Sequence, residues 1–90
     1  MDLERTLPIT HKYGLHARAS TKFVEIAQRF KSSISIAKGE GDAVDGKSVL
    51  ALLTLGAQLG DEIVLRIEGP DAEKALEALT DLVKADFHGV

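Results

Sequence analysis

Residues 12–20, KYGLHARAS, hold the side chains best placed to do chemistry. Gly14 permits a tight turn, and an apolar pattern typical of a helix begins just after His16. The imidazole of His16 therefore stands at or next to the N-cap of that helix, where Ser, Thr, Asp or Asn is usual. The positive end of the helix dipole disfavours imidazolium at this place and favours neutral, nucleophilic imidazole.

The start of the same helix is suited to an anionic group. The backbone N–H groups of Ala17, Arg18 and Ala19 have no acceptor inside a helix, and they could bind a phosphoryl group carried by His16. The guanidinium of Arg18 adds a fixed positive charge and a fork of donors that fits phosphate oxygens. This pattern indicates phosphoryl transfer, and the plain alternative is a surface histidine that only caps a helix.

A second motif also suggests phosphate. Residues 41–48, GDAVDGKS, match the G-x-x-x-x-G-K-S pattern of nucleotide-binding P-loops. P-loop domains need a parallel sheet of several strands, which this short chain cannot build, and Asp42 and Asp45 would place negative charge beside the phosphates. We therefore expect no nucleotide, and a strand-to-helix connection in which Gly46 gives backbone freedom and Ser48 caps a helix.

Length and composition predict one ordinary globular domain over residues 1–90, with 44% hydrophobic and 28% charged residues. The absence of cysteine excludes disulfides, thiolate metal sites and a cysteine nucleophile. His11 and His88 have no carboxylate or cysteine at ligand spacing, so we expect no metal site. We expect His11 to lie on the surface without a function, with a place at the rim of the His16 site as the alternative, and His88 to lie in a frayed tail, DFHGV.

The N-terminal residues lack the apolar segment of a signal peptide, and no apolar run reaches the roughly 20 residues that cross a membrane. We therefore expect a cytoplasmic protein with no membrane partner. A net charge of −3 argues against nucleic-acid binding through bulk charge. Residues 11–31 hold five basic groups and one acidic group, whereas residues 61–90 hold eight acidic and three basic groups. The basic segment is either a solvated face or a docking face for an acidic partner or a phosphate.

Strand and helix patterns alternate along the chain. Alternating apolar residues predict strands at residues 6–10, 32–37, 42–45 and 61–69. Helical spacing predicts helices at residues 17–30, at 48–55 and from Asp71 onward. Pro8 lacks an N–H, so the first strand belongs at a sheet edge. The order β-α-β-β-α-β-α predicts an α+β fold with helices on one face of a mostly antiparallel sheet and water on the other.

The motifs GLHARAS and GKSVLALLTLG, in this order of elements, resemble HPr, the histidine-containing phosphocarrier family of the bacterial phosphotransferase system. The resemblance covers nearly the whole chain, from LPITHKYGLHAR to GDEIVLRIEGPDAEKALEAL. It implies an open-faced β-sandwich, with a four-stranded antiparallel sheet and three helices on one face. It also implies a carrier that takes a phosphoryl group from enzyme I and passes it to a histidine of an enzyme IIA in sugar transport. Such a carrier is not a stand-alone catalyst, needs no metal or cofactor of its own and, because its docking is transient, is expected to be a monomer.

The resemblance also implies roles for individual residues. His16 matches the family's histidine, phosphorylated at Nδ1, and Arg18 matches its arginine companion. Ser48 matches the regulatory serine that HPr kinase/phosphorylase modifies in some bacteria. The expected partner-docking residues are Val49, Leu50, Leu53 and Lys22. We assign Leu52 and Leu55 to the core.

The sequence departs from the family at one position, because Ala19 stands where the motif H-A-R-P has proline. Alanine restores an N–H near the phosphate site but removes the stiffness that proline gives the first helical turn. Two alternatives stay open. The chain could serve the nitrogen-related branch, which SVLALLTLG and DFHGV somewhat resemble. It could instead be a small ligand-binding module, such as an amino-acid-sensing domain, in which His16 merely caps a helix.

Overall fold

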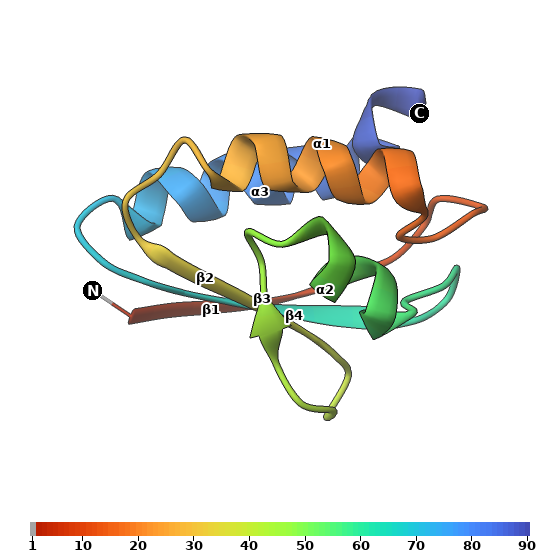
Figure 1. Ribbon diagram of the computed structural model, residues 1–90, viewed down its shortest axis with the longest axis horizontal. Helices are drawn as coiled ribbons and strands as arrows, with labels where there is room; N and C mark the ends of the chain where they lie inside the picture. Colours follow the sequence, from red (N-terminus) through yellow and green to blue (C-terminus); the bar gives the residue numbers. More distant parts are fainter. Residues whose placement is uncertain (1) are drawn as a thin grey trace.

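The computed structural model describes residues 2–90 and shows helices packed on one face of an antiparallel sheet (Figure 1). The strands are β1 (Asp2–Pro8), β2 (Ser33–Lys38), β3 (Val44–Asp45) and β4 (Glu62–Glu68). The helices are α1 (Ala17–Ala27), α2 (Val49–Leu55), α3 (Ala72–Lys84) and a short 3₁₀ helix, η1 (Asp86–Gly89). This element order confirms the predicted α+β open-faced sandwich.

The sheet has the strand order β1-β4-β2-β3, and every neighbouring pair is antiparallel. β1 pairs along its length with β4, from Asp2 opposite Glu68 to Pro8 opposite Glu62. Pro8 therefore lies on an edge strand, as predicted from its missing N–H. β1 begins at Asp2, earlier than the expected range 6–10, because pairing with β4 orders residues that show no apolar alternation.

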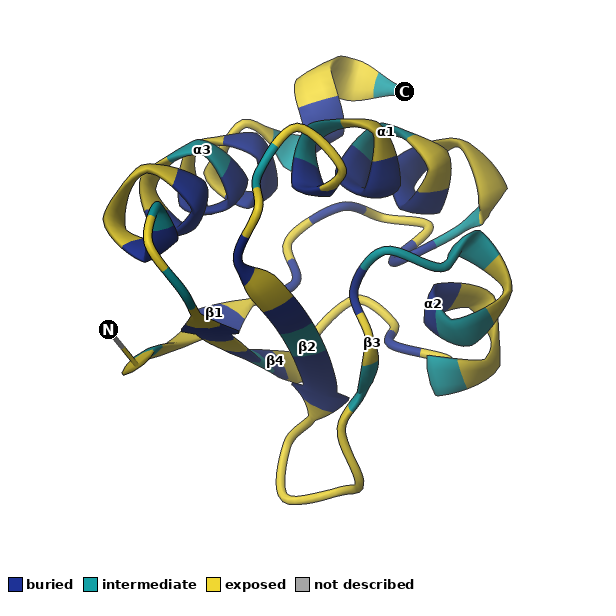
Figure 2. Cartoon of the chain, turned by 60° about the vertical axis from the view of Figure 1, so that its left-hand side comes forward, coloured by how far each residue is buried: buried dark blue, intermediate teal, exposed yellow. Residues whose placement is uncertain are grey.

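Successive side chains along each strand point to opposite faces of the sheet, so one face is buried and the other is exposed to solvent. Side chains that face the helices form the core with α1 and α3. Figure 2 shows the buried residues of these helices on the side that faces the sheet. On the other face, Arg66 of β4 donates to a carboxylate oxygen of Glu4 on β1 at 2.6 Å, and both side chains are exposed. This arrangement confirms that the second face of the sheet meets water.

The ends of α2 form as predicted. The hydroxyl oxygen of Ser48 accepts a hydrogen bond from the amide of Ala51 at 3.2 Å, and Gly56 ends the helix with a left-handed φ of 69°. Leu52 is fully buried as expected, whereas Leu55 is only partly buried against the core. α2 is thus a short helix, and Leu52 is its one fully buried contact with the core.

α1 ends at Ala27, although its apolar pattern continues to residue 30. The amide of Phe30 bonds to the carbonyl of Ala27 at 3.2 Å, so the chain tightens into a turn there. The Lys47 ammonium then donates to the Phe30 carbonyl at 2.8 Å. This long-range contact satisfies a carbonyl beyond the helix end and ties the segment before α2 to the end of α1.

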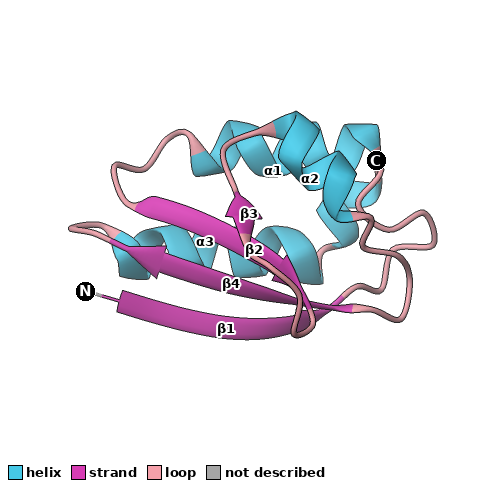
Figure 3. Cartoon of the chain, turned by 60° about the horizontal axis from the view of Figure 1, so that its bottom comes forward, coloured by secondary structure: helices cyan, strands magenta, loops and turns pink. Residues whose placement is uncertain are grey.

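The expectation of a frayed tail is wrong. η1 follows α3 and places Phe87 in the core with 1% of its surface exposed. Asp86, Phe87 and His88 all take left-handed backbone angles, with φ between 50° and 59°. Burial of the large aromatic ring offsets this strained backbone. The chain end consequently lies beside α1 (Figure 3).

Candidate functional site

His16 is the N-cap residue of α1, with an extended backbone (φ −75°, ψ −179°) and a half-exposed side chain. Gly14 makes the preceding turn possible, because its φ is +62° and an added Cβ would lie 2.4 Å from the Ala57 carbonyl oxygen. The amide of Leu15 donates to the same oxygen at 2.9 Å and fixes the turn against the residues after α2. The approach of the chain to His16 is therefore rigidly defined.

In the part of the chain that the structure describes, the first three amides of α1 have no acceptor; Ala17 and Arg18 are exposed, whereas Ala19 is fully buried. Within residues 2–90, nothing accepts a hydrogen bond from the N–H groups of Ala17, Arg18 and Ala19. The first helical bond is made by Ser20, whose amide donates to the His16 carbonyl at 2.9 Å. The ring of His16 thus stands at the positive end of a helix whose donors are unused, which is the geometry expected from the sequence.

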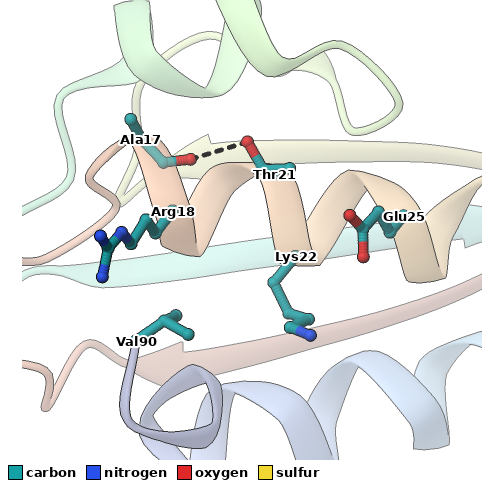
Figure 4. Close-up of a pocket in the computed structure, with 6 residues that line it drawn as sticks. All are labelled: Ala17, Arg18, Thr21, Lys22, Glu25 and Val90. Atoms are coloured by element: carbon teal, nitrogen blue, oxygen red, sulfur yellow. Dashed lines mark hydrogen bonds between the residues drawn. The ribbon is translucent and has the colours of Figure 1, made fainter.

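A groove of about 300 Å³ runs along α1 from Ala17, the residue that follows His16 (Figure 4). Arg18 and Lys22 are one helical turn apart and supply two cationic side chains to its wall. Val90, from the chain end, faces them across the groove (Figure 4). The remaining lining residues are Ala17, Thr21 and Glu25.

His11 was expected on the surface, and this expectation is wrong. Only 7% of its surface is exposed, and its ring centroid lies 4.9 Å from that of His16. Its Nδ1 accepts a hydrogen bond from the amide of Tyr13 at 3.1 Å. Gly14 was a signal in the sequence that could have predicted this burial. Its amide donates to the His11 carbonyl at 2.9 Å, and the resulting turn folds the segment that carries His11 back on itself.

The chain end also contacts the histidine, which the sequence did not predict. The Nε2 atom of His16 lies 3.1 Å from the main-chain oxygen of Val90, 74 residues away. The ring of Phe87 lies 6.3 Å from that of His11, in an edge-on arrangement. The candidate site therefore combines the loop before α1, the start of α1 and the C-terminal turn.

The expected docking residues differ in exposure. Leu50 and Leu53 are 74% and 41% exposed, whereas Val49 is half-buried and packs partly against the core. Tyr13 and Leu59 are also large, exposed apolar residues, at 66% and 57%, and sequence reasoning did not name them. The loops before α1 and after α2 therefore contribute exposed apolar side chains of their own.

The last three amides of the P-loop-like segment already have acceptors within the protein. The amide of Gly46 donates to the Ile34 carbonyl at 2.8 Å, and that of Lys47 donates to the Asp45 carboxylate at 2.9 Å. The amide of Ser48 lies 3.3 Å from the Asp45 carbonyl. These contacts support the interpretation of GDAVDGKS as a strand-to-helix connection.

The described residues were also searched for metal-binding clusters and for helices that could span a membrane. In residues 2–90, no three His, Cys, Asp or Glu side chains gather in a way that could hold a metal ion. No helix in that range has the length and apolar character needed to span a membrane.

Comparison with known proteins places the chain in a family. The family described as "PTS HPr component phosphorylation site" matches residues 3–85. The phosphocarrier protein HPr of Neisseria meningitidis is 42% identical over 85 residues, 94% of each chain. The phosphocarrier protein NPr of Shewanella violacea is 46% identical over 85 residues, 94% of this chain and 92% of that one.

Solved structures of HPr proteins have the same fold as this chain. A crystal structure of HPr from Thermoanaerobacter tengcongensis superposes with a TM-score of 0.90 at 37% identity, over 96% of both chains. A dimer of HPr from the same organism superposes with a TM-score of 0.75 at 37% identity, over 90% of this chain and 92% of that one. The sequence and the fold thus lead to the same assignment, and the chain belongs to the HPr family of phosphocarrier proteins.

Proposed function

We propose that His16 accepts a phosphoryl group from enzyme I of the phosphotransferase system and passes it to a histidine of an enzyme IIA. One observation carries the proposal: the half-buried ring of His16 stands at the start of α1 beside the unused amides of the exposed residues Ala17 and Arg18. An imidazole lone pair attacks phosphorus, and the amides then bind the phosphoryl oxygens. The chain is modified and restored in each cycle, so it acts as a carrier rather than a stand-alone catalyst.

Arg18 supports the transfer through charge. Its exposed guanidinium, one residue beyond the first helical position, pairs with phosphoryl oxygens as they approach His16. Neither this role nor that of the amides needs a metal or cofactor held by this chain. Replacement of Arg18 by glutamine removes the charge and is expected to slow transfer while His16 remains modifiable.

The partner face combines cations with exposed apolar side chains. Leu50 and Leu53 project from α2, Lys22 lines the groove on α1, and the two helices are in contact. A partner that fits this face is acidic around an apolar centre, as we propose for enzyme I and enzyme IIA. Because these contacts form transiently, we propose a monomer as the working form. As a partner of enzyme I, the chain would work in the cytoplasm.

The branch of the system is not decided by the site. Relatives named HPr and a relative named NPr match this chain at 42% and 46% identity, so carriage of phosphate to a sugar-branch or a nitrogen-branch enzyme IIA is supported about equally. Family membership favours both of these over a ligand-binding module in which His16 only caps α1.

A relay assay tests the proposal and separates the branches. Labelled phosphoenolpyruvate, magnesium and enzyme I are incubated with purified enzyme IIA of either branch, with and without this chain. We expect label to reach an enzyme IIA only when the chain is present and His16 is intact, and the branch that accepts it faster is the working one. Label that reaches neither enzyme IIA, with another HPr active in parallel, would contradict the proposal.

A further inference from the structure

Residues 61–90 hold eight acidic and three basic groups, and the proposed phosphoryl transfer uses none of these charges. A groove of about 430 Å³ lies between β1 and α3, and no residue lines both this groove and the groove along α1. Leu3 and Arg5 line it from β1, and six residues line it from α3, among them Glu73, Glu77 and Asp81. We propose that the outer edge of β1 and this groove bind an extended, basic segment of a partner protein, which pairs with β1 as an additional strand. This role does not depend on the proposed phosphoryl transfer.

β1 has a partner strand on one side only. It pairs with β4, and the sheet order β1-β4-β2-β3 leaves its outer edge without a strand in residues 2–90 (Figure 3). Alternate residues of an antiparallel strand direct their main-chain N–H and C=O groups toward the partner strand and away from it. Just beyond β1, the amide of Ile9 donates to the carbonyl of Asp61, on the β4 side, at 2.8 Å. The odd-numbered residues of β1 therefore bond to β4, whereas Glu4 and Thr6 direct their main-chain groups outward, as does Pro8, whose missing N–H costs no bond to β4.

The outward groups of β1 are free to bond to another strand. Within residues 2–90, no main-chain group outside the sheet bonds to the N–H or C=O of Glu4 or Thr6, and both residues are exposed. An unpaired edge is a template for a further strand, and proteins bind extended peptides by this kind of pairing. The two residues supply two donors and two acceptors, two positions apart, so they would fix both the main chain and the register of the added segment.

A row of carboxylates on α3 selects the charge of that segment. α3 contacts β1, and Glu73, Glu77 and Asp81 follow one another at four-residue intervals, about 6 Å, on its exposed surface. Alternate side chains of a strand, which share one face, are about 7 Å apart. Like charges at this helical spacing repel one another, and no ion pair within the described residues uses these three carboxylates. Lysine or arginine at every second position of the added strand would relieve that repulsion.

Thr80 adds a buried polar group to the groove. It is 3% exposed, and its hydroxyl oxygen accepts a hydrogen bond from the Arg5 guanidinium at 3.4 Å. Thr21 and Thr54, in α1 and α2, donate their hydroxyl protons to carbonyls four residues earlier, at 2.9 and 2.8 Å. Thr80 makes no such bond in the described part of the chain, so its proton has no acceptor there. A buried donor without an acceptor is unfavourable, and a bound segment can supply the acceptor.

The two cations of the groove lie at one end of the carboxylate row. Lys84 follows Asp81 by one helical turn, and Arg5 bonds to the residue just before Asp81. Glu73 and Glu77 lie two turns and one turn before Asp81, farther from both cations along the helix. We therefore expect the basic side chains of the added strand to lie against Glu73 and Glu77.

A seven-residue peptide, the length of β1, tests the edge. In this probe lysine alternates with threonine; a second peptide has glutamate in place of lysine, and a third is the lysine peptide with every main-chain amide N-methylated. Each peptide is titrated into the ¹⁵N-labelled protein, and amide shifts and exchange with solvent are followed by NMR. We expect saturable binding of the unmethylated lysine peptide only. The amides of Glu4 and Thr6 should exchange fast in the free protein and slowly in the complex.

Two pairs of variants separate the main chain from the charge. Thr6→Pro removes an outward donor but no bond to β4, and Thr6→Val keeps that donor. Glu77→Gln removes one charge of the row, and Glu40→Gln removes one from the exposed loop between β2 and β3, at the other edge of the sheet. We expect Thr6→Pro to abolish saturable binding and Glu77→Gln to weaken it about two- to fivefold, the share of one exposed ion pair. Thr6→Val and Glu40→Gln should bind as wild type does, and thermal melting checks that all four variants fold.

The absence of saturable binding by the lysine peptide would overturn the proposal and leave the charges of β1 as a guard against association of edge strands. Equal binding of the glutamate peptide, or equal binding by Glu77→Gln and wild type, would also overturn it, because the carboxylate row would then not select the partner's charge. If the protein alone forms a dimer in which the amides of Glu4 and Thr6 are protected, the occupant of the edge is a second copy and not a basic partner. If Thr6→Pro does not fold, the N-methylated peptide carries the same test, since it removes the donors from the other side of the interface.

Discussion

The imidazole rings of His11 and His16 lie 4.9 Å apart, and only His16 is half-exposed. His11 is buried and uses its Nδ1 to accept the amide proton of Tyr13 at 3.1 Å. The arrangement makes His11 a support for the exposed ring, since it fills the space behind that ring and closes the loop before α1.

His11→Ala should therefore act on stability and on transfer. Loss of a buried ring and of a backbone hydrogen bond is expected to lower the free energy of unfolding by about 2–3 kcal/mol, measured by urea denaturation. The rate of phosphorylation of His16 should fall without vanishing. Tyr13→Ala is the control for stability alone, because it keeps the amide and changes the unfolding free energy by only about 0.5 kcal/mol. Equal stability for His11→Ala and wild type would contradict this role.

Two neighbouring leucines on α2 should separate docking from folding. Leu50 is 74% exposed, so Leu50→Ala is expected to weaken enzyme I binding with an unfolding free energy within about 0.5 kcal/mol of wild type. Leu52 is fully buried, so Leu52→Ala should cost about 2–5 kcal/mol of stability. Calorimetric titration and urea melts measure the two effects. The proposed docking face is wrong if Leu50→Ala binds enzyme I as tightly as wild type.

Ser48 combines a structural role with the proposed regulatory one. Its hydroxyl oxygen caps α2 at 3.2 Å from the Ala51 amide, so Ser48→Ala should cost about 1 kcal/mol. Phosphorylation keeps acceptor oxygens at the cap and adds roughly −1.5 to −2 charges near the exposed Leu50. We therefore expect Ser48→Asp to slow transfer from an acidic enzyme I more than Ser48→Ala does. Equal transfer rates for these two variants would speak against a regulatory charge at this position.

Asp71 gives the fold a defined response to acid. Hydrogen bonds to its carboxylate, first from the Ser32 hydroxyl and then from the Lys31 amide, lower the pKa of Asp71 from its ordinary 3.8 to about 2. A lowered pKa means that this carboxylate stabilises the fold fully above pH 3.8 and loses that effect as the pH falls through about 2. Urea midpoints between pH 5 and 2 should consequently fall less steeply in Asp71→Asn. Ser32→Ala removes one donor to the carboxylate, so the pH dependence of its urea midpoint should lie between those of Asp71→Asn and wild type. If the urea midpoint of Asp71→Asn falls with pH as steeply as that of wild type, Asp71 does not have this stabilising role.

The elements with strong local patterns could be predicted from the sequence. The apolar stripe of α3, the alternation of β4 and the cap formed by Ser48 depend on residues close together in the chain, and each was found where expected. Asp71 was correctly placed at the start of α3, but its carboxylate bonds to Lys31 and Ser32 instead of capping its own helix. That contact joins residues about forty positions apart, and no local pattern encodes it.

Of the candidate site, only the residues at the start of α1 could be predicted from the sequence. The types and spacing of His16 and Arg18 follow from helix-start chemistry, whereas the neighbours of the ring come from elsewhere in the fold. His11 is buried because the Gly14 turn folds back, and Val90 arrives through a left-handed turn made without glycine at residues 86–88. Sequence rules assign positive φ to glycine first, so three non-glycine residues in this conformation gave no signal.

The central claim is that His16 carries the phosphoryl group, and the intact mass of the protein tests it most directly. The chain is incubated with phosphoenolpyruvate, magnesium and enzyme I as wild type, as His16→Ala and as His88→Asn, which removes an exposed imidazole and keeps a residue tolerant of positive φ. We predict one added phosphoryl group, labile in acid, on wild type and His88→Asn and none on His16→Ala. Added mass on His16→Ala, or none on wild type with the host's own active enzyme I, would contradict the account.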